Sequence, residues 1–302
     1  MTGFREILVP VDFSEGSLMA VRYGRHFARS SSGSVHLLNV LTDPVIYFPD
    51  AGTPGVVPPA FLNDAREAAE AALLRLVPDE EAVGYTVTRE VIVDSPAEGI
   101  CQHARRQKAD LICIGTHGRT GFSRLALGSV VERVVQHAPC PVLAVRGQGK
   151  GDVLIRKILV AVDFSDFTPV LVQHAQRLAQ AESAELDFVH VVEVDSPNRS
   201  ELSADQPGAQ DHLNSIRSDA ERRLKSLEVP DVKVCRHVLF GQPFVELVKY
   251  ASDQKVDLIL LGTHGRTGLR HWFLGSVAEM VVRKAGCSVL VVPLQQAPAG
   301  TN

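Results

Sequence analysis

The sequence has 302 residues, of which 45% are hydrophobic and 22% are charged, a balance typical of a globular chain with room for two domains. Its formal net charge of −4 gives no electrostatic argument for nucleic acid or a membrane surface, and we predict neither as a partner. Five cysteines without a Cys-x-x-Cys pair argue against a disulfide framework or a zinc knuckle. With no apolar core of a signal peptide near Met1, the expected location is the cytoplasm.

The chain opens with a mostly apolar segment, residues 5–14, that predicts a β-strand ending in Asp-Phe-Ser, and the same pattern returns at 156–165. Ser14 and Ser165 are the last residues of these segments, so we expect each to cap the next helix. A second apolar strand and then a divergent surface loop are predicted in each half. The strands are expected at 35–41 and 186–192, and the loops at 42–60 and 195–210.

The later elements of the two halves also correspond. An Ala-rich or charged helix, an alternating strand, a helix that begins at a proline, and an apolar strand follow one another before a glycine-rich loop, a further helix and a last strand. We expect the Ala-rich or charged helix at 63–76 and 211–227, the alternating strand at 84–92 and 232–239, and the helix that begins at a proline from residues 96 and 243 onward. The apolar strand before the glycine-rich loop is expected at 110–114 and 257–261, and the last strand at 141–145 and 288–292.

Strands that alternate with helices predict parallel pairing, right-handed crossovers and helices on both faces of the sheet. We therefore predict an α/β fold with two repeated doubly wound domains, each a five-stranded parallel sheet of order 3-2-1-4-5. A short Gly-rich linker separates the repeats. The expected domains are 1–147 and 153–294, followed by a disordered tail at 295–302.

The glycine-rich loop is the most informative motif, because residues 115–121 return unchanged at 262–268 and both copies read G-x2-G-x9-G-S. The Gly-Ser opens a helix, whose first-turn N–H groups lack internal partners and carry the positive end of the helix dipole. Glycine also lets the backbone approach an anion closely. Recurrence at identical spacing favours a phosphate-binding loop over a simple corner in the chain.

The predicted strand order places the loop beside a strand-end carboxylate. Ligands of doubly wound sheets bind at the carboxyl ends of the strands that flank the switch point, here the first and fourth strands of each half. Asp12 and Gly115 occupy those ends in the first half, and Asp163 and Gly262 occupy them in the second. A dinucleotide-binding G-x-G-x-x-G and a Walker A Gly-Lys-Ser/Thr are both absent from these positions.

These two motifs, Val-Asp-Phe-Ser and G-x2-G-x9-G-[ST], resemble the universal stress protein family in its tandem two-domain form, and the resemblance covers residues 5–293. In the ATP-binding branch of that family the loop holds the phosphates and ribose. The Asp after strand one contacts the adenosine, and the residue that ends strand two reads adenine through its backbone. The resemblance therefore implies two ATP sites, to which we also assign the two loop arginines and the residue after each serine. The sites are Asp12, Val40, Gly115, Gly118, Arg119, Gly128, Ser129 and Val130, and Asp163, Val191, Gly262, Gly265, Arg266, Gly275, Ser276 and Val277.

Several roles stay open at this level. Arg119 and Arg266 either neutralise phosphate charge or are solvated loop arginines. For His117 and His264 a packing role is favoured over acid–base catalysis. No carboxylate pair with metal spacing and no nucleophile with an evident base stands out, so we predict no protein metal site and at most weak ATP hydrolysis. A Mg²⁺ would arrive on the phosphates of the nucleotide.

The leading functional hypothesis is an ATP-binding protein of stress response or regulation, in which nucleotide occupancy biases conformation or the choice of a protein partner. One alternative is a slow ATP hydrolase or phosphotransferase. The other is an interaction scaffold that needs no nucleotide.

The fifth strand of each half bears on assembly. The predicted order leaves these two apolar strands at sheet edges, which proteins seldom leave open. We therefore predict that they pair antiparallel, with Leu143 and Leu290 at equivalent central positions, so that the chain is its own pseudo-dimer. Any further homodimer would use other surfaces.

Overall fold

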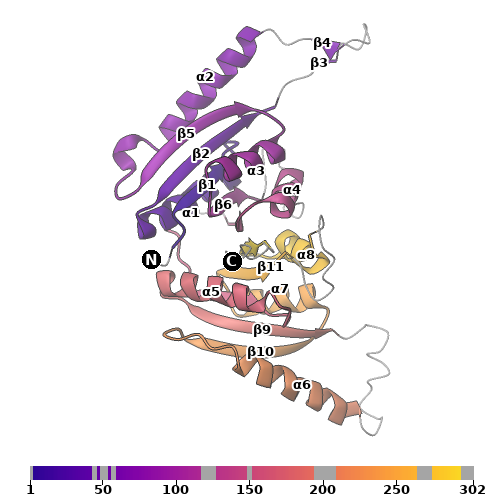
Figure 1. Ribbon diagram of the computed structural model, residues 1–302. Coiled ribbons are helices and arrows are strands. Elements are labelled where there is room, and N and C mark those ends of the chain that lie inside the picture. The colour runs from indigo at the N-terminus through magenta and orange to yellow at the C-terminus, as the bar shows by residue number, and fades with distance from the viewer. Residues whose placement is uncertain are drawn as a thin grey trace, which may run out of the picture.

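The computed structural model describes residues 3–42, 46–47, 54–55, 59–116, 127–147, 152–193, 209–263 and 274–293. Strands and helices alternate in both halves, which lie one above the other in Figure 1. The first half contains β1 (Glu6–Pro10), α1 (Glu15–Ser31), β2 (Ser34–Leu41), β3 (Ile46–Tyr47), β4 (Pro54–Gly55), α2 (Pro59–Leu76), the short helix η1 (Asp79–Glu81), β5 (Thr86–Val93), α3 (Pro96–Arg106), β6 (Leu111–Gly115), α4 (Ser129–His137) and β7 (Val142–Val145). The second half contains β8 (Lys157–Ala161), α5 (Thr168–Glu182), β9 (Glu185–Glu193), α6 (Ala209–Lys225), β10 (Val234–Gly241), α7 (Pro243–Asp253), β11 (Leu258–Gly262), α8 (Ser276–Lys284) and β12 (Ser288–Val292).

One sheet runs through both halves, in the order β10-β9-β8-β11-β12-β7-β6-β1-β2-β5. Within each half all neighbouring strands of this sheet pair in parallel, and their order is the predicted 3-2-1-4-5. The first strand therefore lies beside the fourth in each half, β1 beside β6 and β8 beside β11. This confirms the predicted fold and places a topological switch point in each half.

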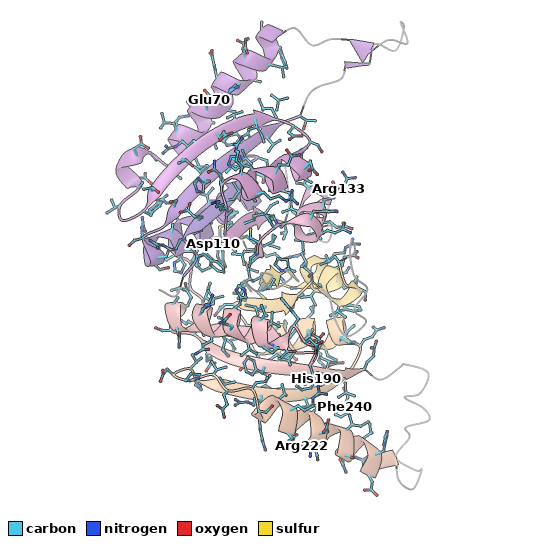
Figure 2. All side chains as sticks on the ribbon, viewed as in Figure 1. Glu70, Asp110, Arg133, His190, Arg222 and Phe240 are labelled. Atoms are coloured by element: carbon cyan, nitrogen blue, oxygen red, sulfur yellow. The ribbon has the colours of Figure 1, made fainter. Side chains whose placement is uncertain are left out.

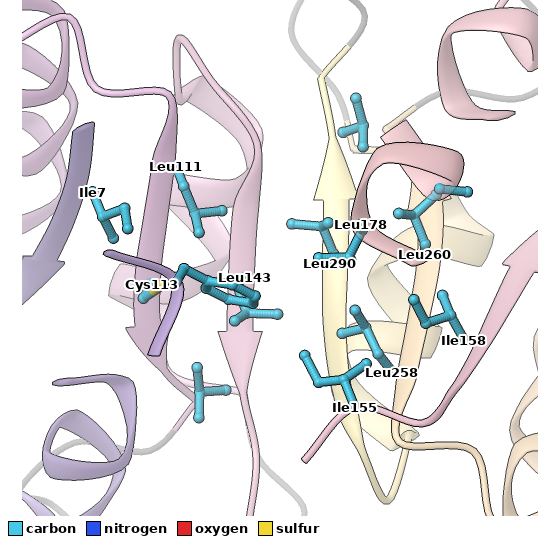
Figure 3. Packing of buried hydrophobic residues seen from close by; sticks show 14 of the residues in the cluster. Ile7, Leu111, Cys113, Leu143, Ile155, Ile158, Leu178, Leu258, Leu260 and Leu290 are labelled. Carbon is cyan, nitrogen blue, oxygen red and sulfur yellow. The ribbon is translucent and has the colours of Figure 1, made fainter. Parts of the chain in front are cut away.

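The two halves meet through their fifth strands, β7 and β12, which pair antiparallel. Leu143 is the register partner of Leu290, with Val142 opposite Val291 and Ala144 opposite Val289. Figure 3 shows Leu143 and Leu290 facing each other across this seam. The predicted pairing is confirmed, and it removes two apolar strand edges that would otherwise be open to other chains.

Helices cover both faces of the sheet because its strands are apolar on both sides. Helices α1, α2, α5 and α6 bury residues such as Phe27, Leu73 and Leu178 against one face. Helices α3, α4, α7 and α8 bury residues such as Ile100 and Val281 against the other. Each of the two hydrophobic clusters contains residues of both halves, so the cores continue across the seam.

The first helix of each half begins differently. Ser14 caps α1 as predicted, since its side chain accepts a hydrogen bond from the Ser17 N–H at 3.3 Å. The prediction that Ser165 caps α5 is wrong, because that helix begins only at Thr168. In α1 the Leu18 N–H donates to the Ser14 carbonyl at 3.0 Å, whereas the equivalent residue of the second half is Pro169, which has no N–H to donate.

The divergent loop of the first half contains more structure than predicted. Strands β3 and β4 pair antiparallel within it, and α2 already begins at Pro59 rather than at residue 63. Proline is well accepted at the start of a helix because that N–H has no helical partner. No helix among the described residues is long and apolar enough to cross a membrane, and the tail at 295–302 lies outside the described part of the chain.

Candidate functional site

Each half has a cavity at the carboxyl ends of its first and fourth strands. The cavity of the first half has a volume of about 510 Å³ and that of the second about 310 Å³, within the range of small-molecule sites. Every predicted site residue that the structure describes lines one of them. These are Asp12, Val40, Gly115, Gly128, Ser129 and Val130 in the first half, and Asp163, Val191, Gly262, Gly275, Ser276 and Val277 in the second.

The remaining predicted residues, Gly118, Arg119, Gly265 and Arg266, lie outside the described residues, as do His117 and His264. The two ends of each glycine-rich loop are nevertheless held together. The Gly128 N–H donates to the Thr116 carbonyl at 3.2 Å, and the Gly275 N–H donates to that of Thr263 at 2.8 Å. The end of the fourth strand and the start of the following helix therefore form adjoining walls of each cavity.

Gly128 precedes α4 at its N-cap position, with φ −64° and ψ 138°, angles that any residue adopts. A Cβ added there would lie 3.6 Å from the Thr116 carbonyl oxygen and 3.9 Å from Val131 Cγ2, which are ordinary contacts. Neither the backbone nor the packing of the described residues thus requires glycine. Since N-caps favour residues with a side-chain acceptor, glycine here leaves the first-turn N–H groups open to an anionic ligand.

Gly115 has a different reason to be glycine. A Cβ at this position would lie 2.3 Å from the carbonyl carbon of Gly16 and 2.7 Å from the Ser17 nitrogen, so a side chain would collide with the backbone of α1. Gly115 therefore allows α1 to pack closely against the end of β6, whatever the cavity binds.

The Asp-Phe-Ser segment forms the same turn in both halves. One carboxylate oxygen of Asp12 accepts hydrogen bonds from the Ser14 N–H (3.0 Å) and hydroxyl (2.6 Å), and Asp163 makes the same pair with Ser165 at 3.0 and 2.7 Å. The intervening phenylalanine, Phe13, has φ 63°, in the left-handed region that costs a non-glycine residue about 1–3 kcal/mol. Phe164 repeats the feature with φ 58°, so a strained turn lies beside each cavity.

The two cavities differ at a buried polar residue on the second strand of each half. Asn39 Nδ2 donates to the Val11 carbonyl at 2.6 Å, and the ring of His190 bonds the equivalent Val162 carbonyl through Nδ1 at 2.7 Å. Asn39 Oδ1 is buried and has no hydrogen-bond partner among the described residues, an arrangement that costs about 1–3 kcal/mol unless a donor arrives. His190 lies toward the carboxyl end of β9 (Figure 2).

Neither Asn39 nor His190 was among the predicted site residues. The available signal was a polar residue inside an apolar strand, directly before Val40 and Val191. A buried side chain of this kind must find a hydrogen-bond partner, and near a strand end that partner can be a ligand.

The two helices that begin at the cavities are linked across the seam. Arg283 of α8 lies 3.6 Å from a carboxylate oxygen of Glu132 on α4 and 3.0 Å from one of Glu279 on its own helix. Arg146, directly after β7, donates to the carbonyls of Val282 and Arg283 at 3.0 and 2.6 Å. A shift of either helix would therefore change contacts made by the other half.

Known proteins match the chain over nearly its whole length. The sequence model of the Universal stress protein family matches twice, over residues 3–146 and 154–293. A universal stress protein of Mycolicibacterium smegmatis is 29% identical over 292 residues, covering 95% of this chain and 96% of that protein. One of Methanocaldococcus jannaschii is 33% identical over 144 residues, covering 47% of this chain and 82% of that protein. The crystal structure of a universal stress protein from Archaeoglobus fulgidus matches with a TM-score of 0.67 at 21% identity, covering 96% of this chain and 98% of that one, which shows a shared fold.

Proposed function

Because the chain belongs to the universal stress protein family, we propose that it binds ATP in both cavities and that nucleotide occupancy sets its conformation or its choice of protein partner under stress. The observation that carries the proposal is the glycine at the N-cap of α4, repeated at α8, which neither the backbone angles nor the packing of the described residues around Gly128 requires. The two binding units of the proposal are residues 1–147 and 153–294.

The cavity walls suit the parts of a nucleotide. The first turns of α4 and α8 offer backbone N–H groups and the Ser129 or Ser276 hydroxyl to phosphate oxygens. In the first half Asp12, Asn39 and Val40 line the same cavity, where they would contact the adenosine part of the nucleotide. A Mg²⁺ ion would be carried mainly by the phosphates, since this ion retains waters and takes few protein ligands.

The link between α4 and α8 supports a regulatory role. Phosphate binding at the start of α4 would act on the helix that carries Glu132, and Glu132 pairs with Arg283 of the helix that begins at the other cavity. Occupancy of one site would thus alter the second, and the seam between the halves would respond to both. Because both side chains of this ion pair are more than one third exposed, its own contribution to the coupling is at most about 1 kcal/mol.

The test is isothermal titration calorimetry with ATP and Mg²⁺ on protein freed of nucleotide. The wild type should bind two nucleotides per chain, whereas Gly128→Val with Gly275→Val should bind none, because a β-branched side chain would occupy the space in front of the helix N-termini. At micromolar affinity the loss corresponds to about 8 kcal/mol of binding free energy. The matched control is Gly286→Val, since a Cβ at Gly286 meets no atom within 4 Å and the residue precedes β12, away from both cavities.

Unchanged ATP affinity in the folded double variant would contradict the glycine-loop assignment. Phosphate release by the wild type above that double variant would favour the slow hydrolase instead. A wild type that neither binds ATP nor releases nucleotide on denaturation would leave the scaffold as the better account.

A further inference from the structure

Three side chains of different metal-binding chemistry meet on β9 and β10, outside the residues that line the two nucleotide cavities. Asp187, Cys235 and His237 each offer one ligand atom, and these atoms all lie within 4.8 Å of one another. Within the described ranges of the chain this is the one such group of histidine, cysteine and acidic residues. A carboxylate, a thiolate and an imidazole together form a donor set that suits Zn²⁺.

The backbone explains why these three residues meet. Cys235 of β10 is the register partner of Asp187 on β9, so their side chains start from neighbouring positions on parallel strands. His237 follows Cys235 by two positions, and alternate residues of a strand point to the same face. Asp187 is only 1% exposed, whereas Cys235 and His237 are half-buried on β10, the edge strand of the sheet. The group therefore combines a buried carboxylate with a thiol and an imidazole that solvent can reach.

The equivalent position in the first half, on β2 and β5, holds side chains that hydrogen-bond to one another. The register pair equivalent to Asp187 and Cys235 is His36 and Thr88. His36 Nδ1 lies 2.7 Å from the Thr88 hydroxyl, and its Nε2 lies 2.8 Å from a carboxylate oxygen of Glu6. The first half thus has a closed hydrogen-bonded cluster without a thiol, whereas the second half has acidic, thiol and imidazole ligands in its place.

We propose that Asp187, Cys235 and His237 form a binding site for a Zn²⁺ ion, with water as the fourth ligand. Ligand atoms around tetrahedral Zn²⁺ are separated by about 3–4 Å, so small rotations of the half-buried Cys235 and His237 side chains bring the three atoms to bonding distance. The thiolate and the carboxylate together neutralise the charge of the ion, and the Cys235 proton leaves to solvent on binding.

Two neighbours of Asp187 tune the site in opposite directions. The Tyr250 hydroxyl donates a hydrogen bond to Asp187 Oδ2 at 2.8 Å and orients the carboxylate, as outer partners of metal ligands commonly do. The Lys157 ammonium lies 3.6 Å from the same oxygen and repels a cation, although it is nearer to Glu185, at 3.2 Å. Tyr250→Phe should therefore weaken Zn²⁺ binding about 10- to 100-fold. Lys157→Gln should strengthen it about 3- to 10-fold, because the repulsion is removed.

The experiment is equilibrium dialysis of the untagged full chain against ZnCl₂ without nucleotide, followed by titration with Co²⁺ as a spectroscopic probe. We expect one Zn²⁺ per chain and a sulfur-to-cobalt charge-transfer band. Cys235→Ser should abolish the band and weaken Zn²⁺ binding at least about 100-fold, since a thiolate ligand is lost. His237→Gln should weaken binding by a similar factor and is the second variant if Cys235→Ser fails to fold.

The matched control is Cys287→Ser, which removes another half-buried thiol and should leave both readouts unchanged. The proposal is overturned if the wild type shows no stoichiometric site, if the band survives Cys235→Ser, or if Cys287→Ser weakens binding as much. Gly128 and Gly275 line the cavities, whereas Asp187, Cys235 and His237 do not. The Gly128→Val and Gly275→Val double variant should therefore bind Zn²⁺ like the wild type in this assay without nucleotide. The metal site and the proposed ATP sites can therefore fail independently.

Discussion

The seam between the two halves allows a sharp test of how the chain folds as one unit. Leu143 and Leu290 are register partners on the antiparallel strands β7 and β12, and they are 1% and 2% exposed. Directly opposite residues of such strands have Cβ atoms about 4.5–5.5 Å apart, so their side chains contact each other. We therefore predict that truncations at these two positions are coupled.

The magnitude follows from burial. Each single change, Leu143→Ala or Leu290→Ala, should lower the free energy of unfolding by about 2–5 kcal/mol, the range for leucines truncated in a packed core. The double variant should lose less than the sum of the two, by about 0.5–3 kcal/mol, because the contact removed by the first truncation cannot be lost again.

Urea unfolding followed by far-ultraviolet circular dichroism measures all four proteins of the cycle. The control cycle combines Leu290→Ala with Leu37→Ala on β2, which is equally buried but four strands away, about 19 Å. That pair should be additive within about 0.5 kcal/mol. If the seam pair is as additive as the control, the two leucines do not touch and the reasoning about the fused sheet is refuted.

Two further predictions concern glycine and pH. In protein without nucleotide, Gly115→Ala should lower the melting temperature by several degrees, because its Cβ would lie 2.3 Å from the Gly16 carbonyl carbon. Gly128→Ala should leave the melting temperature nearly unchanged, because its Cβ would make only ordinary contacts. Equal melting temperatures of the two variants would contradict the different roles of these glycines. Burial lowers the pKa of His103 below its ordinary 6.5, with Glu90 opposing the effect and Arg106 and His36 adding to it, so folding favours the neutral ring. The stability it contributes is present above pH 6.5 and is lost as the pH falls through the folded-state pKa, by at most about 1.4 kcal/mol per pH unit. His103→Gln should reduce that slope in urea titrations between about pH 5 and 7, and an unaltered slope would contradict the assignment.

Much of the architecture could be predicted because it depends on local patterns and general rules of chain topology. Apolar runs, the proline that begins α3 and α7, and the repeated Asp-Phe-Ser indicated where elements begin. Right-handed crossovers then left few strand orders to consider, and the uncharged fifth strands predicted the seam. Prediction failed where a single residue changed a local hydrogen bond, as when Pro169 delayed the start of α5 beyond the position that Ser165 could cap.

The sequence by itself determined the duplicated α/β fold, the switch points and the candidate residues of the glycine-rich loops, because each of these is carried by neighbours in the chain or by an exact internal repeat. Only the tertiary structure decided which distant side chains meet. Asp187 and Cys235 share no motif and become neighbours through the register of β9 and β10, and Glu132 reaches Arg283 only because the seam brings α4 near α8. The partner of Asn39 was likewise undecided, since a buried amide has to be satisfied by whatever the folded chain places around it. Contacts of this kind depend on strand register and helix packing, which sequence spacing does not encode.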